Sequence, residues 1–496
     1  MDPASLHDDT VRTTPLDELE LSNSDRRLVE KFNRRRRDSG ADFSSRFASQ
    51  RRSYTSEELL TASDIANFDV GIGEHVLSND IYTAIESARM EVLFVTCFWA
   101  KSDSQARFSL ALKNLASSLQ SMKLSIDVNI CFSSLSLWQK LFHTQAKEGQ
   151  HWPPETHAKT FGLPEPSELR SKDQHQLYGV RLNVTSIFHR PFSVMHPKFV
   201  IVDRKHAFLP SCNVSWENWF EGCVHLKGDV VSHFWDFYRD TWDELFYKYR
   251  KVKPFIPDPY DKRMVEFGSE LLTSVNLDLT SVPTLFLPSP HCPNPNLRPF
   301  WFQAAPPPPP TPLNLFILAA LDHANEDIYI QTPNLTSPPV MDALAHALER
   351  GINVTIITSA RMMILEQLAT AGTVTELCVR RLIVRYRAIL QQYQSSTDPS
   401  NGLEEGRHKP GQLSVRYFRP DARSNMAKEP VKSHLKLTII DRRIVVLGSG
   451  NMDRASWYTS QELSLAFFSP QMAEKIKETV SAALEGRLGG DSVENG

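Results

Sequence analysis

One pattern of polar residues in this chain has the types and spacing needed for phosphate chemistry. It begins with His196-Pro-Lys198, continues through four apolar residues to Asp203, and reaches Ser211 and Asn213 in a short turn further on. Lysine ammonium groups, serine hydroxyls and asparagine amides supply positive charge and hydrogen-bond donors to phosphate oxygens. The pattern therefore predicts a phosphate-binding site.

The same pattern occurs a second time. It comprises His434-Leu-Lys436, Asp441, and a turn containing Ser449 and Asn451. Both copies keep the same internal spacing, so the motif belongs to an internal duplication. Two imidazoles that titrate near neutrality can divide the work on a phosphodiester, one attacking phosphorus and the other protonating the leaving alkoxide. The pattern itself does not say which histidine attacks.

No cofactor or metal is expected at this site. Converging ammonium groups would oppose the binding of a cation, and the residues named above already provide a nucleophile, a proton donor and a phosphate clamp. The sequence contains no HExxH motif, EF-hand loop or phosphate-cradling glycine loop. The predicted chemistry is a metal-independent attack on a phosphodiester.

Strand periodicity predicts how these side chains are presented. Residues two apart on a strand project from the same face, so each histidine is expected beside its lysine, and each serine beside its asparagine. The apolar segments 199–202 and 437–440 read as buried strands that fix these groups. Asp203 and Asp441 each stand at an odd offset from their histidine, which predicts supporting or turn-stabilising roles.

A glutamate follows each motif at a similar interval of sequence. Glu221 comes after the first histidine and Glu462 after the second, and each begins a strand-like stretch. A carboxylate that accepts a hydrogen bond from Nδ1 fixes the tautomer of an imidazole and stabilises its charged form. We therefore expect both glutamates to support the catalytic histidines.

Helix and strand patterns also repeat around the motifs. A helix-to-strand pattern over residues 80–97 recurs over 315–333, and each is followed by a second pair, over 108–132 and over 339–358. Ala88 and Ala324 occupy equivalent positions, and their separation is almost that of His196 from His434. Alternating helices and strands predict α/β sandwiches with central mixed β-sheets.

Composition divides the chain into five segments. Residues 1–62, rich in Ser, Asp and Arg, are interpreted as a disordered basic tail, and 487–496 as a second disordered tail. Residues 63–282 are predicted to form the first domain and 313–486 the second. The proline-rich stretch 283–312, with its five consecutive prolines, is interpreted as the linker between them.

The bulk composition is that of a globular protein without a strong overall field. The chain of 496 residues is 41% hydrophobic and 23% charged, with a formal net charge of −3. That charge disfavours general attraction to nucleic acid, although the arginines at 34–37 could bind an anionic surface locally. The acidic N-terminus does not resemble a targeting peptide, and no apolar stretch is long enough to span a bilayer. Six cysteines without CxxC spacing are expected to be reduced and mostly buried.

At the two motifs the sequence resembles the phospholipase D superfamily of HKD phosphodiesterases, and around residues 328–359 its cardiolipin synthase and bacterial-type branch. The second motif matches the family pattern in full, whereas Pro210 replaces the usual glycine in the first. The resemblance implies two α/β/α halves packed around one shared active site in a monomer. It also implies that His196 is the nucleophile and His434 the general acid.

The expected function is headgroup hydrolysis or phosphatidyl transfer on phospholipids through a phosphohistidine, in an intracellular protein that is cytoplasmic or in peripheral contact with membranes. Two alternatives stay open. One is a nuclease of the same superfamily, for which the arginine-rich segment 380–387 would supply a basic surface. The other is an inactive scaffold, suggested by Pro210. The headgroup and the acceptor alcohol are not predicted.

Overall fold

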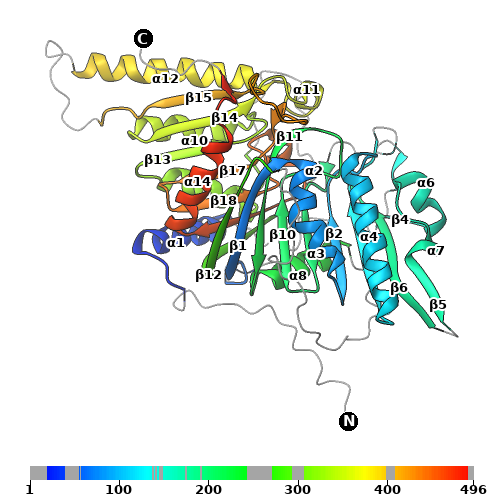
Figure 1. The fold of residues 1–496 in the computed structure, drawn as a ribbon. Helices are drawn as coiled ribbons and strands as arrows, with labels where there is room; N and C mark the ends of the chain where they lie inside the picture. Colours follow the sequence, from blue (N-terminus) through cyan, green and yellow to red (C-terminus); the bar gives the residue numbers. More distant parts are fainter. Residues whose placement is uncertain are drawn as a thin grey trace.

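The protein is described from a computed structural model. The structure describes residues 19–39, 57–136, 149–173, 176–189, 193–242, 271–292, 307–397 and 408–489, together with positions 55, 139 and 142–144 between them. Helices cover a large central β-sheet on both faces (Figure 1). This is the mixed α/β architecture of two repeated α/β/α halves that the sequence predicts.

The first half follows the predicted order of helices and strands. It runs through β1 (Leu60–Ile72), α2 (Gly73–Val76), η3 (Leu77–Ile81), α3 (Tyr82–Glu86), β2 (Glu91–Val95), α4 (Asp103–Ser121), β3 (Ser125–Phe132), β4 (Gln150–Trp152), η4 (Pro154–Thr156), α6 (His157–Phe161), α7 (Pro166–Leu169), β5 (Arg170–Asp173), β6 (Gln176–Ser186), β7 (Phe188–His189), β8 (Ser193–Val194), β9 (Phe199–Val202), β10 (His206–Pro210), β11 (Trp219–Lys227) and α8 (Val230–Trp242). Strands β2, β3 and β6 are parallel, while β2, β9, β10, β11 and β1 pair antiparallel in that order.

The second half repeats this plan. It consists of β12 (Thr273–Ser289), α9 (Pro312–His323), β13 (Asp327–Gln331), α10 (Pro338–Glu349), β14 (Asn353–Ser359), α11 (Ile364–Ala371), α12 (Thr375–Thr397), β15 (Leu413–Phe418), β16 (Lys432–Ser433), β17 (Leu437–Ile440), β18 (Ile444–Gly448), α13 (Arg454–Tyr458), β19 (Glu462–Phe468), α14 (Pro470–Ala483) and β20 (Leu488–Gly489). Strands β13, β14 and β15 are parallel, and β13, β17, β18, β19 and β12 pair antiparallel, as their counterparts do.

Strands β1 and β12 join the halves into one sheet. They pair antiparallel with each other, and each also pairs with a strand of its own half, β1 with β11 and β12 with β19. A core on one face of the sheet contains side chains from both halves, including Phe286 of β12 and the buried faces of α8 and α14. Two further cores lie under the outer helices of the individual halves. The halves therefore share a sheet and a core.

The predicted boundaries around the linker are wrong in one respect. Strand β12 crosses the expected boundary between residues 282 and 283, and by its pairing it is the counterpart of β1. Within the described part of the proline-rich stretch, residues 283–289 belong to β12, residues 290–292 and 307–311 lie between β12 and α9, and Pro312 begins α9. The prolines mark a clear break in composition, but prolines 307–310 lie in the connection between a strand and a helix of the same half. Residues 293–306 of this stretch lie outside the described residues.

The N-terminal segment also differs from its prediction. Helix α1 (Asn23–Asp38) begins after Ser22, which accepts a hydrogen bond from the backbone of Asp25. Phe32 is fully buried and contacts Phe316 of α9 at 5.7 Å between ring centroids. Arg35 of the basic cluster donates to Asp322 at 2.9 Å. This helix was not predicted, because its apolar stripe of Leu28, Val29 and Phe32 stands among many charged residues. The rest of the predicted tail, apart from 19–39, 55 and 57–62, lies outside the described residues.

The C-terminal tail was predicted to begin at residue 487, but β20 pairs with β15 at Leu488 and Gly489. Residues 490–496 lie outside the described part. All six cysteines are buried thiols outside any disulfide, as expected from their scattered spacing. Within the described segments, no helix combines the length and the apolar character that a membrane crossing requires.

Candidate active site

The two His-x-Lys segments lie immediately before the buried strands β9 and β17. In each segment the lysine ammonium donates to the carbonyl of its own histidine, Lys198 to His196 at 2.9 Å and Lys436 to His434 at 2.7 Å. The residues themselves are outside the regular strands, which corrects the expectation that they would sit on them. Each histidine and its lysine nevertheless lie together, because the lysine folds back on the carbonyl.

The two motif aspartates hold tight turns that follow the strands. Asp203 accepts hydrogen bonds from the backbone N–H groups of residues 89–91, and Asp441 from those of residues 325–327. Both have positive φ angles, 53° and 49°. Each carboxylate therefore links the turn to the start of the neighbouring strand, β2 or β13. This geometry is that of a structural support.

The imidazole of each motif is hydrogen-bonded to the glutamate of the other half. His196 Nδ1 lies 2.8 Å from Glu462 Oε2, and His434 Nδ1 lies 2.7 Å from Glu221 Oε1. Both glutamates are buried. Since a carboxylate accepts, each Nδ1 carries the proton and each Nε2 is left as the reactive nitrogen. The sequence predicted the carboxylate support but not this exchange between halves.

Backbone contacts repeat the exchange. The His196 N–H donates to the carbonyl of Gln461 at 3.0 Å, and the His434 N–H donates to the carbonyl of Phe220 at 2.9 Å. Each acceptor is the residue just before a support glutamate. The parallel pairing of β11 with β16, through Trp219–Lys432 and Phe220–Ser433, brings the second motif against the first half. Both histidines therefore belong to one site assembled across the interface of the halves.

The two motif serines hold the glutamates in place. Ser211 Oγ donates to Glu221, and Ser449 Oγ donates to Glu462 Oε2 at 2.5 Å. Each hydroxyl also accepts a backbone N–H, from Gly222 at 3.0 Å and from residue 463 at 3.0 Å. The hydroxyl protons point to carboxylates, so a direct phosphate contact, which was one of the roles expected, is not formed in this arrangement.

Pro210 does not disturb the first turn. It ends β10 opposite Cys223, just as Gly448 ends β18 opposite Ser464. The Ser211 N–H donates to the Gly222 carbonyl at 2.8 Å, and its counterpart in the second half makes the same bond at 2.9 Å. Proline is tolerated here because the N–H of residue 211, not of residue 210, makes the bond that sets the turn.

The two motif asparagines differ. Asn213 Oδ1 accepts from the Phe98 N–H at 3.2 Å. Asn451 Nδ2 donates to Asp453 at 3.0 Å, and its buried Oδ1 makes no hydrogen bond with the described residues. An unsatisfied buried polar atom is costly unless water or a ligand completes it. The free atom of Asn451 is thus a hydrogen-bond acceptor, which can take a proton from water but cannot donate to a phosphate oxygen.

Burial and charge set the ionisation of the histidines. Desolvation lowers the pKa of His434 to about 3, partly opposed by the negative charge of Glu221. Desolvation also lowers the pKa of His196, and the negative charge of Glu462 partly opposes this effect. Lys436 depresses the pKa of His196, and Lys198 that of His434, so each imidazole also senses the ammonium of the other half. Both rings are neutral in the resting protein at neutral pH.

The pKa values of Lys436 and Glu221, which both lie beside His434, are shifted as well. Desolvation lowers the pKa of Lys436 to about 7, partly opposed by Glu221. Burial disfavours the charged form of Glu221, but His434, Lys436 and Ser211 outweigh that effect and lower its pKa. The carboxylate is therefore ionised at neutral pH, whereas Lys436 can change its charge near neutrality.

The two imidazoles are not equivalent in their surroundings. Lys436 Nζ lies 2.8 Å from His434 Nε2, whereas Nε2 of His196 makes no hydrogen bond to the described part of the chain. The side chain of His196 is 14% exposed and that of His434 is 4% exposed. His196 consequently has the open nitrogen, and His434 has a proton-bearing group beside its reactive nitrogen.

Sequence reasoning missed Asp453 and Ser456 at this site, and it did not predict the contact of Trp219 with His434. Trp219 packs on His434 with ring centroids 4.8 Å apart. Ser456 Oγ donates to Glu462 Oε1 at 2.7 Å, and Asp453 accepts from the Ser456 N–H at 2.9 Å as the cap of α13. The Asp-x-x-Ser spacing at 453–456 is a helix-start signal, which could have placed this turn next to the motif.

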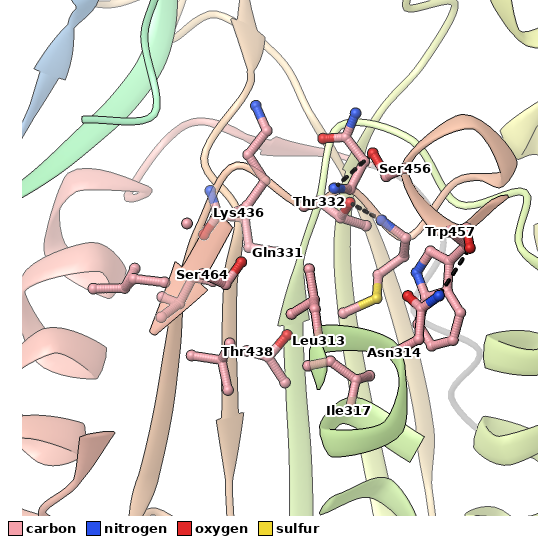
Figure 2. A pocket seen from close by; sticks show the side chains of 17 residues that line it. Leu313, Asn314, Ile317, Gln331, Thr332, Lys436, Thr438, Ser456, Trp457 and Ser464 are labelled. Atoms are coloured by element: carbon pink, nitrogen blue, oxygen red, sulfur yellow. Dashed lines mark hydrogen bonds between the residues drawn. The ribbon is translucent and has the colours of Figure 1, made fainter. Parts of the chain in front are cut away.

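A small cavity lies beneath Lys436. Its lining includes the polar side chains of Gln331, Thr438, Asn451 and Ser464 (Figure 2). Its volume of about 20 Å³ is sufficient for about one water molecule and far too small for a phospholipid. Of the two motif histidines, His196 is the more accessible from solvent.

Aromatic residues and further histidines near the first motif are mostly buried. Trp216 is 61% exposed, whereas Phe220 is fully buried against Phe418. His189 stacks on His291, His206 is hydrogen-bonded to His225, and His233 is hydrogen-bonded to the carbonyl of residue 58.

Comparisons with known proteins find a matching family model and a similar fold. A family model described as "Cardiolipin synthase, PLD-like domain" matches residues 317–483, which include the second motif. Phosphatidylserine synthase of Haemophilus influenzae shares the fold, with a TM-score of 0.53 and 13% identity over 88% of this chain and 90% of that chain. No curated protein sequence is similar enough to count as a match.

A second solved structure, a phospholipase D family member named Nuc from Salmonella typhimurium, is 20% identical, with a TM-score of 0.25 over 37% of this chain and 91% of that one. The family model covers the second half only, and the fold likeness to the synthase extends over both halves. Residues 317–483 thus match a phospholipase D-like domain model, and the fold of the chain is similar to that of the synthase.

Proposed function

We propose that this protein is a metal-independent phosphodiesterase that hydrolyses or exchanges the headgroup of phospholipids through a phosphohistidine intermediate. The observation that carries the proposal is the reciprocal pairing of His196 with Glu462 and of His434 with Glu221. Each pair fixes the proton on Nδ1 and aims a neutral Nε2 into a site shared by the halves.

His196 is the proposed nucleophile. Its Nε2 lone pair attacks phosphorus, forming a P–N bond as the bond from phosphorus to the headgroup oxygen breaks. The open Nε2 of His196 and its greater exposure favour it over His434. The charge that develops on the attacking imidazole is stabilised by the buried carboxylate of Glu462.

His434 is the proposed proton donor. A bound phosphodiester brings a negative charge beside His434 and Lys436, which raises the pKa of the imidazole and draws the ammonium group from Nε2 toward the phosphate oxygens. As its pKa rises, Nε2 of His434 takes up a proton from solvent, and it then gives this proton to the departing alkoxide, which leaves the imidazole neutral again. In the second step water or an alcohol attacks phosphorus, gives its proton to His434, and the P–N bond breaks to release His196.

Lys198 and Lys436 are the proposed phosphate clamp, and the Nδ2 donors of Asn213 and Asn451 are proposed to assist them. Their ammonium groups face the non-bridging oxygens, where fixed charge stabilises the transition state. They would also repel a metal cation, so the mechanism is proposed to need none. Ser211 and Ser449 contribute indirectly by holding the glutamates.

A phospholipid is favoured over a nucleic acid as substrate. The family model is described by a phospholipid-synthesising enzyme, and the similar full-length structure is a phosphatidylserine synthase. A nuclease would need a basic groove, and one observation favours it: Arg380, Arg381 and Arg387 are exposed on α12. The complete set of motif residues speaks against an inactive scaffold. The protein is proposed to act as a monomer, because one chain supplies both halves of the site.

Headgroup release from mixed phospholipids, in EDTA and beside digestion of single-stranded DNA, tests the proposal. Lipid turnover without DNA cleavage is the expected result. DNA cleavage without lipid turnover would replace the proposal with the nuclease, and neither activity in folded protein would leave the scaffold. Glu474→Gln, on the exposed face of α14, serves as the matched active control.

A further inference from the structure

Helix α11 has its apolar and polar faces reversed. Leu365 is 84% exposed and Leu368 is 47% exposed, and Ile364 and the preceding Met363 are each 38% exposed. The buried residue of this helix is polar: Gln367 donates to Asn334 at 3.0 Å and accepts from Thr375. A surface helix normally buries its apolar stripe and exposes its polar one. The outward apolar side chains, Met363, Ile364, Leu365 and Leu368, are called the α11 face below.

The α11 face is adjacent to positive charge. The stretch 361–387 contains five arginines and two glutamates, so it is net positive in a chain whose formal total is −3. Arg381 and Arg385 line a pocket of about 550 Å³ together with Leu368. Arg385 is paired with Asp342 at 2.8 Å, whereas Arg381 is exposed. Apolar side chains beside arginines match the two layers of a membrane surface, acyl chains and anionic headgroups.

A hydrogen-bonded chain connects the α11 face to the active site. Gln367 binds Asn334, Asn334 Nδ2 lies 3.4 Å from Asp453 Oδ2, and that carboxylate accepts from Asn451 at 3.0 Å. Arg454, one residue further on, donates to the carbonyl of Thr370 in α11 at 3.0 Å. Helix α11 also follows directly after β14, whose Ser359 is bonded to Ser433 beside His434. Figure 1 shows α11 and α12 along one edge of the molecule.

From these observations we infer that the α11 face and Arg381 form the surface by which this protein docks on an anionic phospholipid bilayer. The leucines enter the interface, and the arginines contact the headgroups. The inference rests on the proposed phospholipid substrate, since docking by the α11 face would hold the protein at the bilayer that contains this substrate. A second copy of the chain is the competing occupant of such an apolar face.

Flotation with lipid vesicles tests the docking surface without any turnover. The double variant Leu365→Ser/Leu368→Ser is compared with wild type on phosphatidylcholine vesicles with and without phosphatidylglycerol, at low and high salt. Leu110→Ser is the matched control, because Leu110 is 58% exposed on α4 in the other half. Both leucines of the double variant are exposed, so its fold should be unchanged, which circular dichroism and the melting temperature would verify.

We expect wild type and the control to float with the anionic vesicles, and the double variant to bind them at least about tenfold more weakly. Added salt should weaken the binding of wild type, and Arg381→Gln should reduce that salt effect. Equal flotation of wild type and the double variant, or flotation of neither, would overturn the inference. It would also fall if the leucine changes converted a dimer to a monomer in light scattering and left vesicle binding unchanged.

Failure of docking and failure of the proposed function give different results. Headgroup release in detergent micelles needs no bilayer, so a protein that is active on micelles but does not bind vesicles would contradict the docking surface alone. A protein that binds vesicles and releases no headgroup would contradict the proposed function alone.

Discussion

The substitution Glu462→Gln tests whether the carboxylate of the second half supports the histidine of the first. Glu462 is fully buried and accepts from His196, Ser449 and Ser456 at 2.8, 2.5 and 2.7 Å. Glutamine keeps the shape, and its oxygen can still accept from Nδ1. The Ser456 hydroxyl can reverse to accept from the new amide. The substitution therefore removes the negative charge with little change in packing.

The expected loss follows from the strength of that interaction. A hydrogen bond to a charged group contributes about 1.5–3 kcal/mol, and each 1.36 kcal/mol corresponds to about tenfold in rate, so kcat/KM should fall about 10- to 150-fold. The assay is release of p-nitrophenol from a soluble phosphodiester, with the melting temperature measured in parallel. Glu474→Gln on α14 should retain wild-type activity, because its side chain is exposed. A folded Glu462→Gln protein within about twofold of wild type would refute the role assigned to this carboxylate.

Three further changes test other parts of the structure. Burial lowers the pKa of Lys436 to about 7, so kcat/KM should fall as the pH rises through that value and the ammonium group loses its proton. Lys436→Arg should move this alkaline limb of the pH profile to higher pH, and a limb that does not move would assign it to another group. Pro210→Gly should leave headgroup release within about twofold of wild type, because the Ser211 bonds already match those of the second half; a gain above about tenfold would show that proline distorts the turn. Phe32→Ala should destabilise the protein by about 3–5 kcal/mol in urea denaturation, and Glu30→Ala on the exposed side of α1 by much less; equal small effects would mean that α1 does not pack as described.

Much of the fold could be predicted because the same order of helices and strands occurs in both halves of the chain. The helix and strand over residues 315–333 appear as α9 and β13, and the pair over 339–358 as α10 and β14. Local periodicity is sufficient for such elements, since each buries one regular face. Helix α1 was missed for the opposite reason: its few apolar residues stand among arginines, and only packing against α9 makes the helix stable.

Most residues of the site could be predicted, but the hydrogen-bond partner of each residue could not. The spacing identified both histidines and both glutamates, yet it assigned no partner, because the partner depends on how the halves pack. Glu221 belongs to the same half as His196 and follows it closely in sequence, but its carboxylate binds His434 of the other half. The serines illustrate the same limit: their motif position suggested phosphate, and their actual acceptors are the glutamates.

In the proposed mechanism the two halves contribute opposite roles to one reaction, which trapping of the covalent intermediate tests directly. A phosphodiester with a p-nitrophenyl leaving group needs no proton donor in the first step. His434→Asn should therefore release a stoichiometric burst of p-nitrophenol and retain the phosphoryl adduct, because the second step lacks its base. Mass spectrometry should locate the adduct on His196, and His196→Asn should give neither burst nor adduct. An adduct on any other residue, or a burst from His196→Asn, would contradict the account.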